Sequence, residues 1–174
     1  MKRNSTGQGH LTNENGKRFE KVVLDNIIKQ LNLYESTILN IECYKNENNS
    51  LIVFEQSNFY KYAFSKYDID YKIKASKKYV ADLWLLKNEK DLYLMEVKSQ
   101  KSAGSTDEKI YGGLMLDLIY KEIFNDDKFT YRKICYVTND YFEDKKYQTP
   151  KDILKRNGIE FYIDKLDINW INKK

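Results

Sequence analysis

Two neighbouring runs of apolar and aromatic residues, 79–87 and 92–100, constrain the fold of this chain more than any other feature. The residues between them (Asn-Glu-Lys-Asp) have the composition of a turn, so the two runs predict a β-hairpin. Three charged residues, Asp82, Glu96 and Lys98, interrupt runs that otherwise favour burial. A buried charge requires a partner, a metal ion or a function, so this hairpin is the first place to look for a site.

Side-chain alternation decides whether these charges can meet. Glu96 and Lys98 are two residues apart and share one face of a strand. Asp82 joins that face only in the register that places it opposite Glu96. That register requires a connection with an odd number of residues, such as residues 88–90, or a bulge. A two- or four-residue loop would instead pair Asp82 with Val97 and put the acids on opposite faces. We predict the odd connection.

Two adjacent carboxylates repel one another, and the neighbouring Lys98 offsets only part of that repulsion. A divalent cation would offset the rest, and ligands that are all oxygen atoms favour Mg²⁺. The predicted ligands are Asp82, Glu96 and the carbonyl group of Val97. Lys98 could then orient or deprotonate a metal-bound water, or neutralise charge in a transition state. The alternative is a surface hairpin with a ladder of ion pairs, which does not explain why large apolar residues such as Trp84 would share the charged face.

Asp82, followed across a hairpin by Glu, Val and Lys at 96–98, resembles the core motif of the PD-(D/E)xK nuclease superfamily, with Ala81 in place of the usual proline. The continuation adds to this resemblance. Gln100 and the segment 102–109, which begins with small residues and ends in Asp-Glu-Lys, are similar to the segment after this motif in some type II restriction endonucleases.

The resemblance implies a single nuclease domain over residues 1–174, of the α/β class, with a mixed central β-sheet flanked by helices on both faces (an αβββαβ core). It implies a Mg²⁺-dependent endodeoxyribonuclease that hydrolyses phosphodiester bonds of double-stranded DNA. The kind implied is a small, sequence-specific type II restriction endonuclease of a restriction–modification system, acting as a homodimer. A glutamate on the first helix often supports the metal site of this superfamily, and Glu20 matches that element. Gln100 is expected to support the site as well.

Three other functions stay open at this point. A structure-specific nuclease, such as a Holliday-junction resolvase, would use the same core. A DNA-binding module could keep the same fold without catalytic activity, although Asp82, Glu96 and Lys98 are all present. An ordinary α/β interaction protein would have no nucleic acid partner.

The formal net charge of +4 is modest, so the distribution of lysines matters more than their number. Lysines interleave with tyrosines between residues 61 and 78, a pattern that suits phosphate contacts but also describes an ordinary solvated face. Loops at 66–78 and 139–146 are the candidates for base contacts. Lys109 lies near a predicted helix start, where a cation is disfavoured unless an anion such as Glu96 or a substrate phosphate is close. The lysines predicted to contact DNA are Lys72, Lys74, Lys77, Lys78, Lys109, Lys145 and Lys146.

Several classes of protein are disfavoured by what the sequence lacks. No run approaches the ~18 apolar residues of a membrane span, and the polar first residues are not an apolar signal segment. We therefore expect a cytoplasmic protein without a membrane partner. His10 is the only histidine, which disfavours histidine-based metal sites and triads. Glycine-rich phosphate loops are absent, so no nucleotide cofactor is expected. Cys43 and Cys135 lack ligand spacing and are expected to be ordinary buried thiols.

Hydrophobic periodicity predicts helices and strands in alternation. The predicted strands are 36–43 (or a loop), 51–55, 59–64, 79–87, 92–100, 131–138 and 159–163. The predicted helices are 13–33, 106–124 and a third that starts near Thr149 and ends at Asn157-Gly158. Segment 67–78 is irregular, and 139–148 is a polar loop. Strands separated by helices predict a mixed sheet that is covered on both faces.

Overall fold

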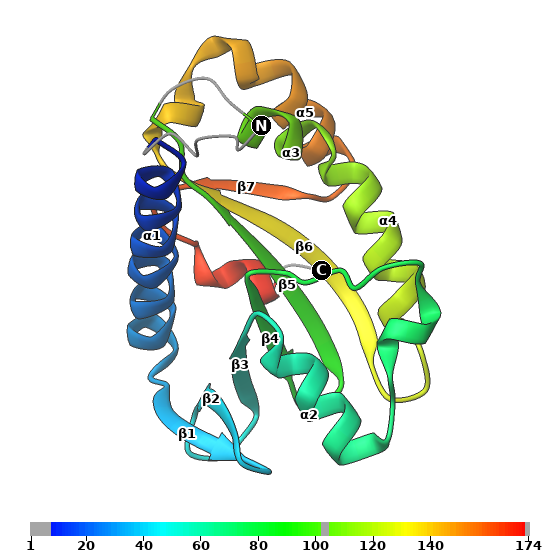
Figure 1. Cartoon of the computed structure of the whole chain (residues 1–174). Helices are drawn as coiled ribbons and strands as arrows, with labels where there is room; N and C mark the ends of the chain where they lie inside the picture. The colour runs from blue at the N-terminus through cyan, green and yellow to red at the C-terminus, as the bar shows by residue number, and fades with distance from the viewer. Residues whose placement is uncertain (1–7, 102–104, 173–174) are drawn as a thin grey trace, which may run out of the picture.

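The computed structural model describes residues 8–101 and 105–172. A seven-stranded sheet forms its centre, with the strands side by side in chain order (Figure 1). The strands are β1 (Tyr34–Ile38), β2 (Ile41–Lys45), β3 (Leu51–Glu55), β4 (Leu83–Lys87), β5 (Asp91–Lys98), β6 (Thr130–Thr138) and β7 (Glu160–Ile163). The α-helices are α1 (Gln8–Leu31), α2 (Asn58–Tyr67), α3 (Ser105–Tyr111), α4 (Gly113–Phe124) and α5 (Gln148–Arg156). The short 3-10 helices are η1 (Tyr71–Lys74), η2 (Asp140–Glu143), η3 (Lys145–Tyr147) and η4 (Ile168–Asn172).

Strand directions make the sheet mixed, as predicted. The strands from β1 to β5 are antiparallel to their neighbours, whereas β5, β6 and β7 are parallel to one another. Parallel neighbours need crossover connections, and these are α3 with α4 between β5 and β6, and α5 between β6 and β7. The elements α1, β3, β4, β5, α4 and β6 supply the predicted αβββαβ order, and the protein is of the α/β class.

Helices cover both faces of the sheet. On one face, α1 and η4 pack against the strands through Val23, Ile27 and Trp170. On the other face, α2, α4 and α5 bury their apolar sides against the sheet. Alternate residues of β4 enter the two cores, with Leu85 in the first and Trp84 in the second. Burial on both faces explains why this strand is a continuous apolar run without polar alternation.

The central hairpin has the predicted register. β4 and β5 pair Trp84 with Leu94 and Leu86 with Leu92, and three residues, 88–90, connect the two strands. The first two residues of the connection adopt positive φ angles of 53° and 55°. Both strands are shorter than the predicted runs, because β4 begins after residue 82 and β5 ends at residue 98.

The prediction of a strand at 59–64 is wrong, because this segment belongs to α2. Its buried side chains are Phe59, Tyr60, Tyr62 and Ala63. This spacing forms one face of a helix, and the ring of Phe59 stacks on Trp84 with centroids 4.7 Å apart. Aromatic residues favour strands locally, but here packing against the sheet decides the outcome. The segment 36–43, predicted as a strand or a loop, contributes to the β1–β2 hairpin.

The predicted helix 106–124 is divided at Gly112 into α3 and α4. Gly113, the first residue of α4, lies very close to the sheet. A Cβ atom there would come within 3.0 Å of Leu154 Cδ2 and of the Tyr136 hydroxyl. Glycine therefore allows α4 to begin directly over β6. Residues 1–7 and residues 102–104, the first part of the segment with small residues, lie outside the described residues.

The last third of the chain follows the prediction with local differences. The predicted loop 139–148 contains η2 and η3, and α5 begins one residue before Thr149. Gly158 follows α5 with φ +80°, and β7 forms as expected. The tail folds back as η4, which was not predicted, and buries Trp170.

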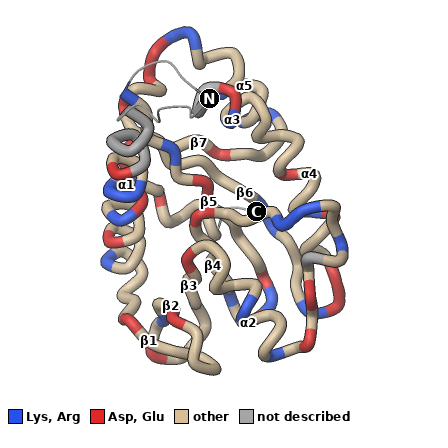
Figure 2. The backbone as a smooth tube through the Cα atoms, in the orientation of Figure 1, with Lys and Arg blue, Asp and Glu red and all other residues tan. Residues whose placement is uncertain are grey.

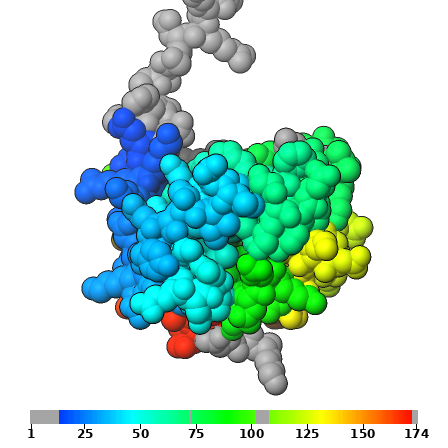
Figure 3. All heavy atoms as spheres, turned by 90° about the horizontal axis from the view of Figure 1, so that it is seen from below, coloured from blue at the N-terminus to red at the C-terminus, as the bar shows by residue number. Residues whose placement is uncertain are grey.

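At one end of the sheet, the β1–β2 hairpin, α2 and the β4–β5 connection lie side by side, as the space-filling view shows (Figure 3). An ion pair of 2.8 Å joins Lys66 of α2 to Glu89 of that connection. Among the residues that the structure describes, no helix is long and apolar enough to cross a membrane.

Candidate active site

The three charged residues of the central hairpin meet at one point. Lys98 Nζ lies 2.6 Å from Asp82 Oδ2 and 2.6 Å from Glu96 Oε2. The two carboxylates therefore converge on a single cation-sized position. The predicted geometry, with both acids and the lysine on a common face, is confirmed.

The backbone of β5 holds Asp82 in place. Asp82 immediately precedes β4, and its Oδ2 atom accepts a hydrogen bond from the backbone N–H of Val97 at 2.7 Å. Its carbonyl oxygen accepts a hydrogen bond from the backbone N–H of Gln56, just after β3. Three neighbouring strands thus orient this carboxylate, which therefore does not depend on a flexible loop.

All three side chains are largely removed from water. Their exposed fractions are 20% for Asp82, 8% for Glu96 and 13% for Lys98. Burial raises the pKa of Glu96, Lys98 opposes that rise, and Asp82 adds to it. Burial alone would lower the pKa of Lys98, but Glu96 and Asp82 raise it above the ordinary lysine value. Lys98 is therefore a cation in this arrangement, with both acids as its partners.

Glu20 of α1 approaches this group from another element. Burial raises the pKa of Glu20, Asp82 raises it further, and Lys98 lowers it. Glu20 therefore lies near enough for the charges of Asp82 and Lys98 to affect its pKa, and its role in support of a metal site stays a prediction. Glu20 also lines a separate groove between α1 and β3 that contains Glu55.

A cavity of about 460 Å³ opens over the three charged residues. Three of the predicted DNA-contacting lysines, Lys77, Lys78 and Lys109, line it together with them. The first two belong to the connection before β4, where basic residues form a run along the chain (Figure 2). Their ammonium groups lie over the rings of Tyr79 and Tyr60, at 4.8 and 4.7 Å from the centroids. The cavity thus combines paired acids with cationic side chains.

The remaining predicted residues lie elsewhere. Lys74 binds Asp126 at 2.9 Å, and Lys145 and Lys146 lie on η3; none of the three is among the residues that line this cavity. The side chain of Lys72 lies outside the described residues. Gln100 is buried beyond the end of β5, and its backbone N–H and carbonyl both bond to the side chain of Asn139, at 3.0 and 2.9 Å.

The carboxylate oxygens of Asp82 and Glu96 suit Mg²⁺ better than a metal ion whose ligands must all come from the protein. Among the described side chains, no group of three or more His, Cys, Asp or Glu residues is arranged to hold a metal ion. Mg²⁺ is usually held by one or two carboxylates and completes its shell with waters and substrate phosphate. Asp82 and Glu96 match that pattern. The backbone N–H of Val97 binds Asp82, and the role of its carbonyl group as a ligand stays a prediction.

Sequence patterns missed two tyrosines in this cavity, Tyr120 of α4 and Tyr136 of β6. The Tyr120 hydroxyl lies 3.5 Å from Glu96 Oε1. The Tyr136 hydroxyl is buried and has no hydrogen-bond partner among the described residues. Both occupy positions whose sequence pattern is that of ordinary core. Tyr136 stands beside Glu96 in the parallel register of β5 and β6, and only that pairing brings it to the site.

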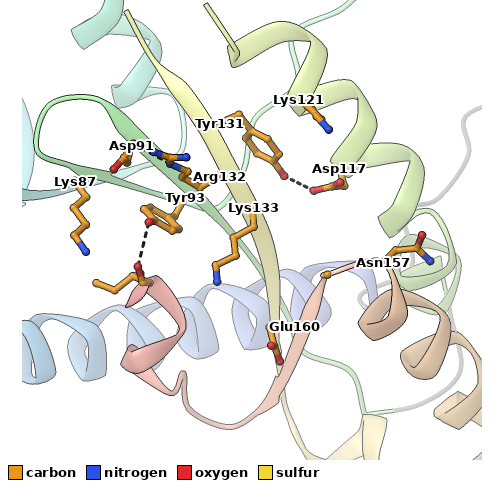
Figure 4. A pocket seen from close by; sticks show the side chains of 12 residues that line it. Lys87, Asp91, Tyr93, Asp117, Lys121, Tyr131, Arg132, Lys133, Asn157 and Glu160 are labelled. Carbon is orange, nitrogen blue, oxygen red and sulfur yellow. Dashed lines mark hydrogen bonds and ion pairs between the residues drawn. The ribbon is translucent and has the colours of Figure 1, made fainter. Parts of the chain in front are cut away.

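A larger cavity, of about 880 Å³, lies elsewhere and contains none of the predicted site residues. Its walls come from β5, β6, α4 and the start of β7 (Figure 4). Two pairs of side chains in its walls interact: Arg132 pairs with Asp91 at 2.7 Å, and the Tyr131 hydroxyl bonds to Asp117. Size alone therefore does not identify the site in this molecule.

No family model matches the sequence, and no curated protein matches it. A similar solved structure is that of an XisH family protein from Nostoc punctiforme PCC 73102. It has a TM-score of 0.39 and 9% sequence identity, over 83% of this chain and 88% of that one. A likeness at this level carries no argument about function, so the fold and the site rest on the chain's own residues.

Proposed function

We propose that this protein is a Mg²⁺-dependent endonuclease that hydrolyses phosphodiester bonds of double-stranded DNA. The observation that carries the proposal is the convergence of Asp82 and Glu96 on Lys98 at a cavity lined by further lysines. Paired carboxylates beside a lysine suit phosphodiester hydrolysis, because the reaction needs a cation site and a positive group near the phosphate.

Each side chain has a distinct role in this proposal. Asp82 and Glu96 would hold Mg²⁺, with Glu20 in support. The chemistry supplied by a bound Mg²⁺ is Lewis-acid activation of water and neutralisation of phosphate charge. Lys98 would position the attacking water or stabilise the negative charge that develops on the phosphate. Lys77, Lys78 and Lys109 would position the DNA backbone.

The finer proposal, from the resemblance of the hairpin motif, is a type II restriction endonuclease that cuts at a short fixed sequence. The test is incubation of purified protein with plasmid and with long linear DNA, in Mg²⁺ or EDTA, beside the Glu96→Ala variant. Discrete fragments that require both Mg²⁺ and Glu96 support the proposal. Cleavage of four-way junctions alone would point to a resolvase, and DNA binding without any cleavage to a module that lacks activity.

Alanine replacement of Lys77, Lys78 or Lys109 is expected to weaken DNA binding, because each ammonium group neutralises a phosphate of the DNA backbone. Removal of one such group should lower the slope of log affinity against log salt by about one. Fluorescence anisotropy with a labelled duplex in Ca²⁺, at several salt concentrations, measures this slope. Lys29→Ala, an exposed lysine in the last turn of α1, is the matched control. Equal slopes for all variants would remove these lysines from the DNA interface.

The homodimer is also part of the proposal, and exposed apolar residues on α3 and α4 support it. Tyr111, Met115 and Leu118 are each more than half exposed and recur at helical spacing, on the solvent side of a helix pair whose other side lines the cavity. The double variant Met115→Glu, Leu118→Glu is expected to convert a dimer to a monomer in light scattering. Ile73→Glu, at an exposed apolar residue of η1, should leave the mass unchanged. A monomeric wild-type protein would contradict this part of the proposal.

A further inference from the structure

The two oxygens of Glu96 face different partners. Oε2 binds the ammonium group of Lys98 at 2.6 Å. Oε1 lies 3.5 Å from the Tyr120 hydroxyl, which comes from α4 on the helical layer above the sheet. An ionised carboxylate only accepts hydrogen bonds, so the phenol is the donor in this contact.

The position of that hydroxyl is set by the aromatic core. Tyr120 is 1% exposed, and its ring lies against Trp84 and Phe124, with centroids 5.8 and 5.9 Å away. Tyr79 packs near it at 6.5 Å. Packing on several sides fixes the orientation of the Tyr120 ring, and in this orientation its hydroxyl points to Glu96.

Packing alone does not require a hydroxyl at this position. Phe124, one turn later on α4, fills the same aromatic cluster and lies 5.0 Å from Trp84 without a polar atom. What distinguishes Tyr120 from Phe124 is the contact with Glu96. Glu96 also supplies a hydrogen-bond partner to this buried hydroxyl, which reduces the cost of removing it from water.

We propose that Tyr120 is a positioning residue that holds the Glu96 carboxylate in its cation-binding orientation. This inference rests on the cation site of the proposed function. Its hydroxyl restrains Oε1, so that Oε2 points to the position where Lys98 and Asp82 meet. The distance of 3.5 Å is at the outer limit of a hydrogen bond, and such contacts commonly shorten when ligand binds. Groups that hydrogen-bond to metal-binding carboxylates typically change metal affinity by about 10- to 100-fold when removed.

The experiment compares Tyr120→Phe with wild-type protein in Mn²⁺ binding, followed by electron paramagnetic resonance in the absence of DNA. Tyr131→Phe is the matched control, because it removes a buried tyrosine–carboxylate hydrogen bond, to Asp117, away from the site. Tyr120→Phe should weaken Mn²⁺ binding about 10-fold, and Tyr131→Phe should leave it unchanged. Thermal melts of both variants separate this effect from a general loss of stability.

The other outcomes overturn the inference in distinguishable ways. Mn²⁺ binding that is lost in Glu96→Gln but unchanged in Tyr120→Phe would overturn the role of Tyr120 alone. Equal weakening by Tyr120→Phe and Tyr131→Phe would show a general packing effect and would also overturn it. Wild-type protein that binds no Mn²⁺ would overturn this inference together with the cation site of the proposed function.

Discussion

Replacement of Glu96 by glutamine is expected to reduce Mg²⁺-dependent cleavage by about a thousandfold, the order of loss seen when a key electrostatic group is removed from an active site. Glutamine keeps the shape of the side chain but supplies no negative charge for a cation. Gel assays of plasmid cleavage across a range of Mg²⁺ concentrations measure the loss. Glu143→Gln, at an exposed position in η2, is the control and should cleave normally.

The same variant is expected to be at least as stable as the wild-type protein near neutral pH. Burial raises the pKa of Glu96, so the folded carboxyl group binds its proton more tightly than the unfolded one. The tighter proton binding stabilises the folded state fully at pH values below the pKa of Glu96 in the unfolded chain. This stabilisation is lost as the pH rises through the pKa of Glu96 in the folded protein. The ionised carboxylate therefore opposes folding at neutral pH, and glutamine avoids this cost. Lys98 still has Asp82 as its partner.

Thermal melts at several pH values between about 5 and about 8 test this expectation. The melting temperature of Glu96→Gln relative to wild type should rise with pH across this range. A large fall in melting temperature at neutral pH would mean that Glu96 holds the hairpin together, as in the alternative of a structural ion-pair ladder. Unchanged cleavage would remove Glu96 from the proposed catalytic machinery.

Replacement of Lys98 by methionine is expected to abolish cleavage and also to destabilise the fold, by about 3–5 kcal/mol in the absence of divalent cations. Methionine keeps the apolar stem but leaves Asp82 and Glu96 side by side without the shared ammonium group. The raised pKa of Lys98 also predicts that Lys98→Met destabilises the fold. The charged lysine stabilises the folded state throughout the neutral pH range, and the substitution removes this contribution.

Mg²⁺ should restore part of that stability, because a divalent cation can replace the missing ammonium group between the two acids. Urea denaturation with and without Mg²⁺, at constant ionic strength, measures the difference. Lys74→Met is the matched control, because its lysine is paired with a single carboxylate, Asp126, and Mg²⁺ should give no comparable recovery. A Lys98→Met protein that Mg²⁺ does not stabilise would show that the paired acids do not bind the cation.

Local patterns in the sequence were sufficient for the core of the site. The alternation of side chains along two apolar runs, together with a short turn, predicted the register that places Asp82, Glu96 and Lys98 on one face. A hairpin is a local structure, since its contacts lie close in sequence and a one-residue slip would reverse every side chain. The helix that carries Glu20 was predictable for a similar reason, because its apolar stripe repeats with helical spacing.

Other features depended on contacts between residues far apart in the chain. Segment 59–64 has the composition of a strand, and only its packing against the sheet makes it a helix. Lys109 lines the cavity while Lys145 and Lys146 do not, although all three are basic residues in polar segments. Where a helix crosses a sheet is a tertiary property that local periodicity does not encode.

The clearest division between sequence and tertiary structure is at Glu96. Local periodicity was enough to predict that this carboxylate shares a face with Lys98, because two residues separated by one position always do so on a strand. The contact of Tyr120 with its second oxygen could not be predicted in this way, because it depends on how α4 packs across the aromatic core. Strand periodicity is a property of the backbone, whereas the approach of a helix to a sheet is set by the packing of many side chains at once.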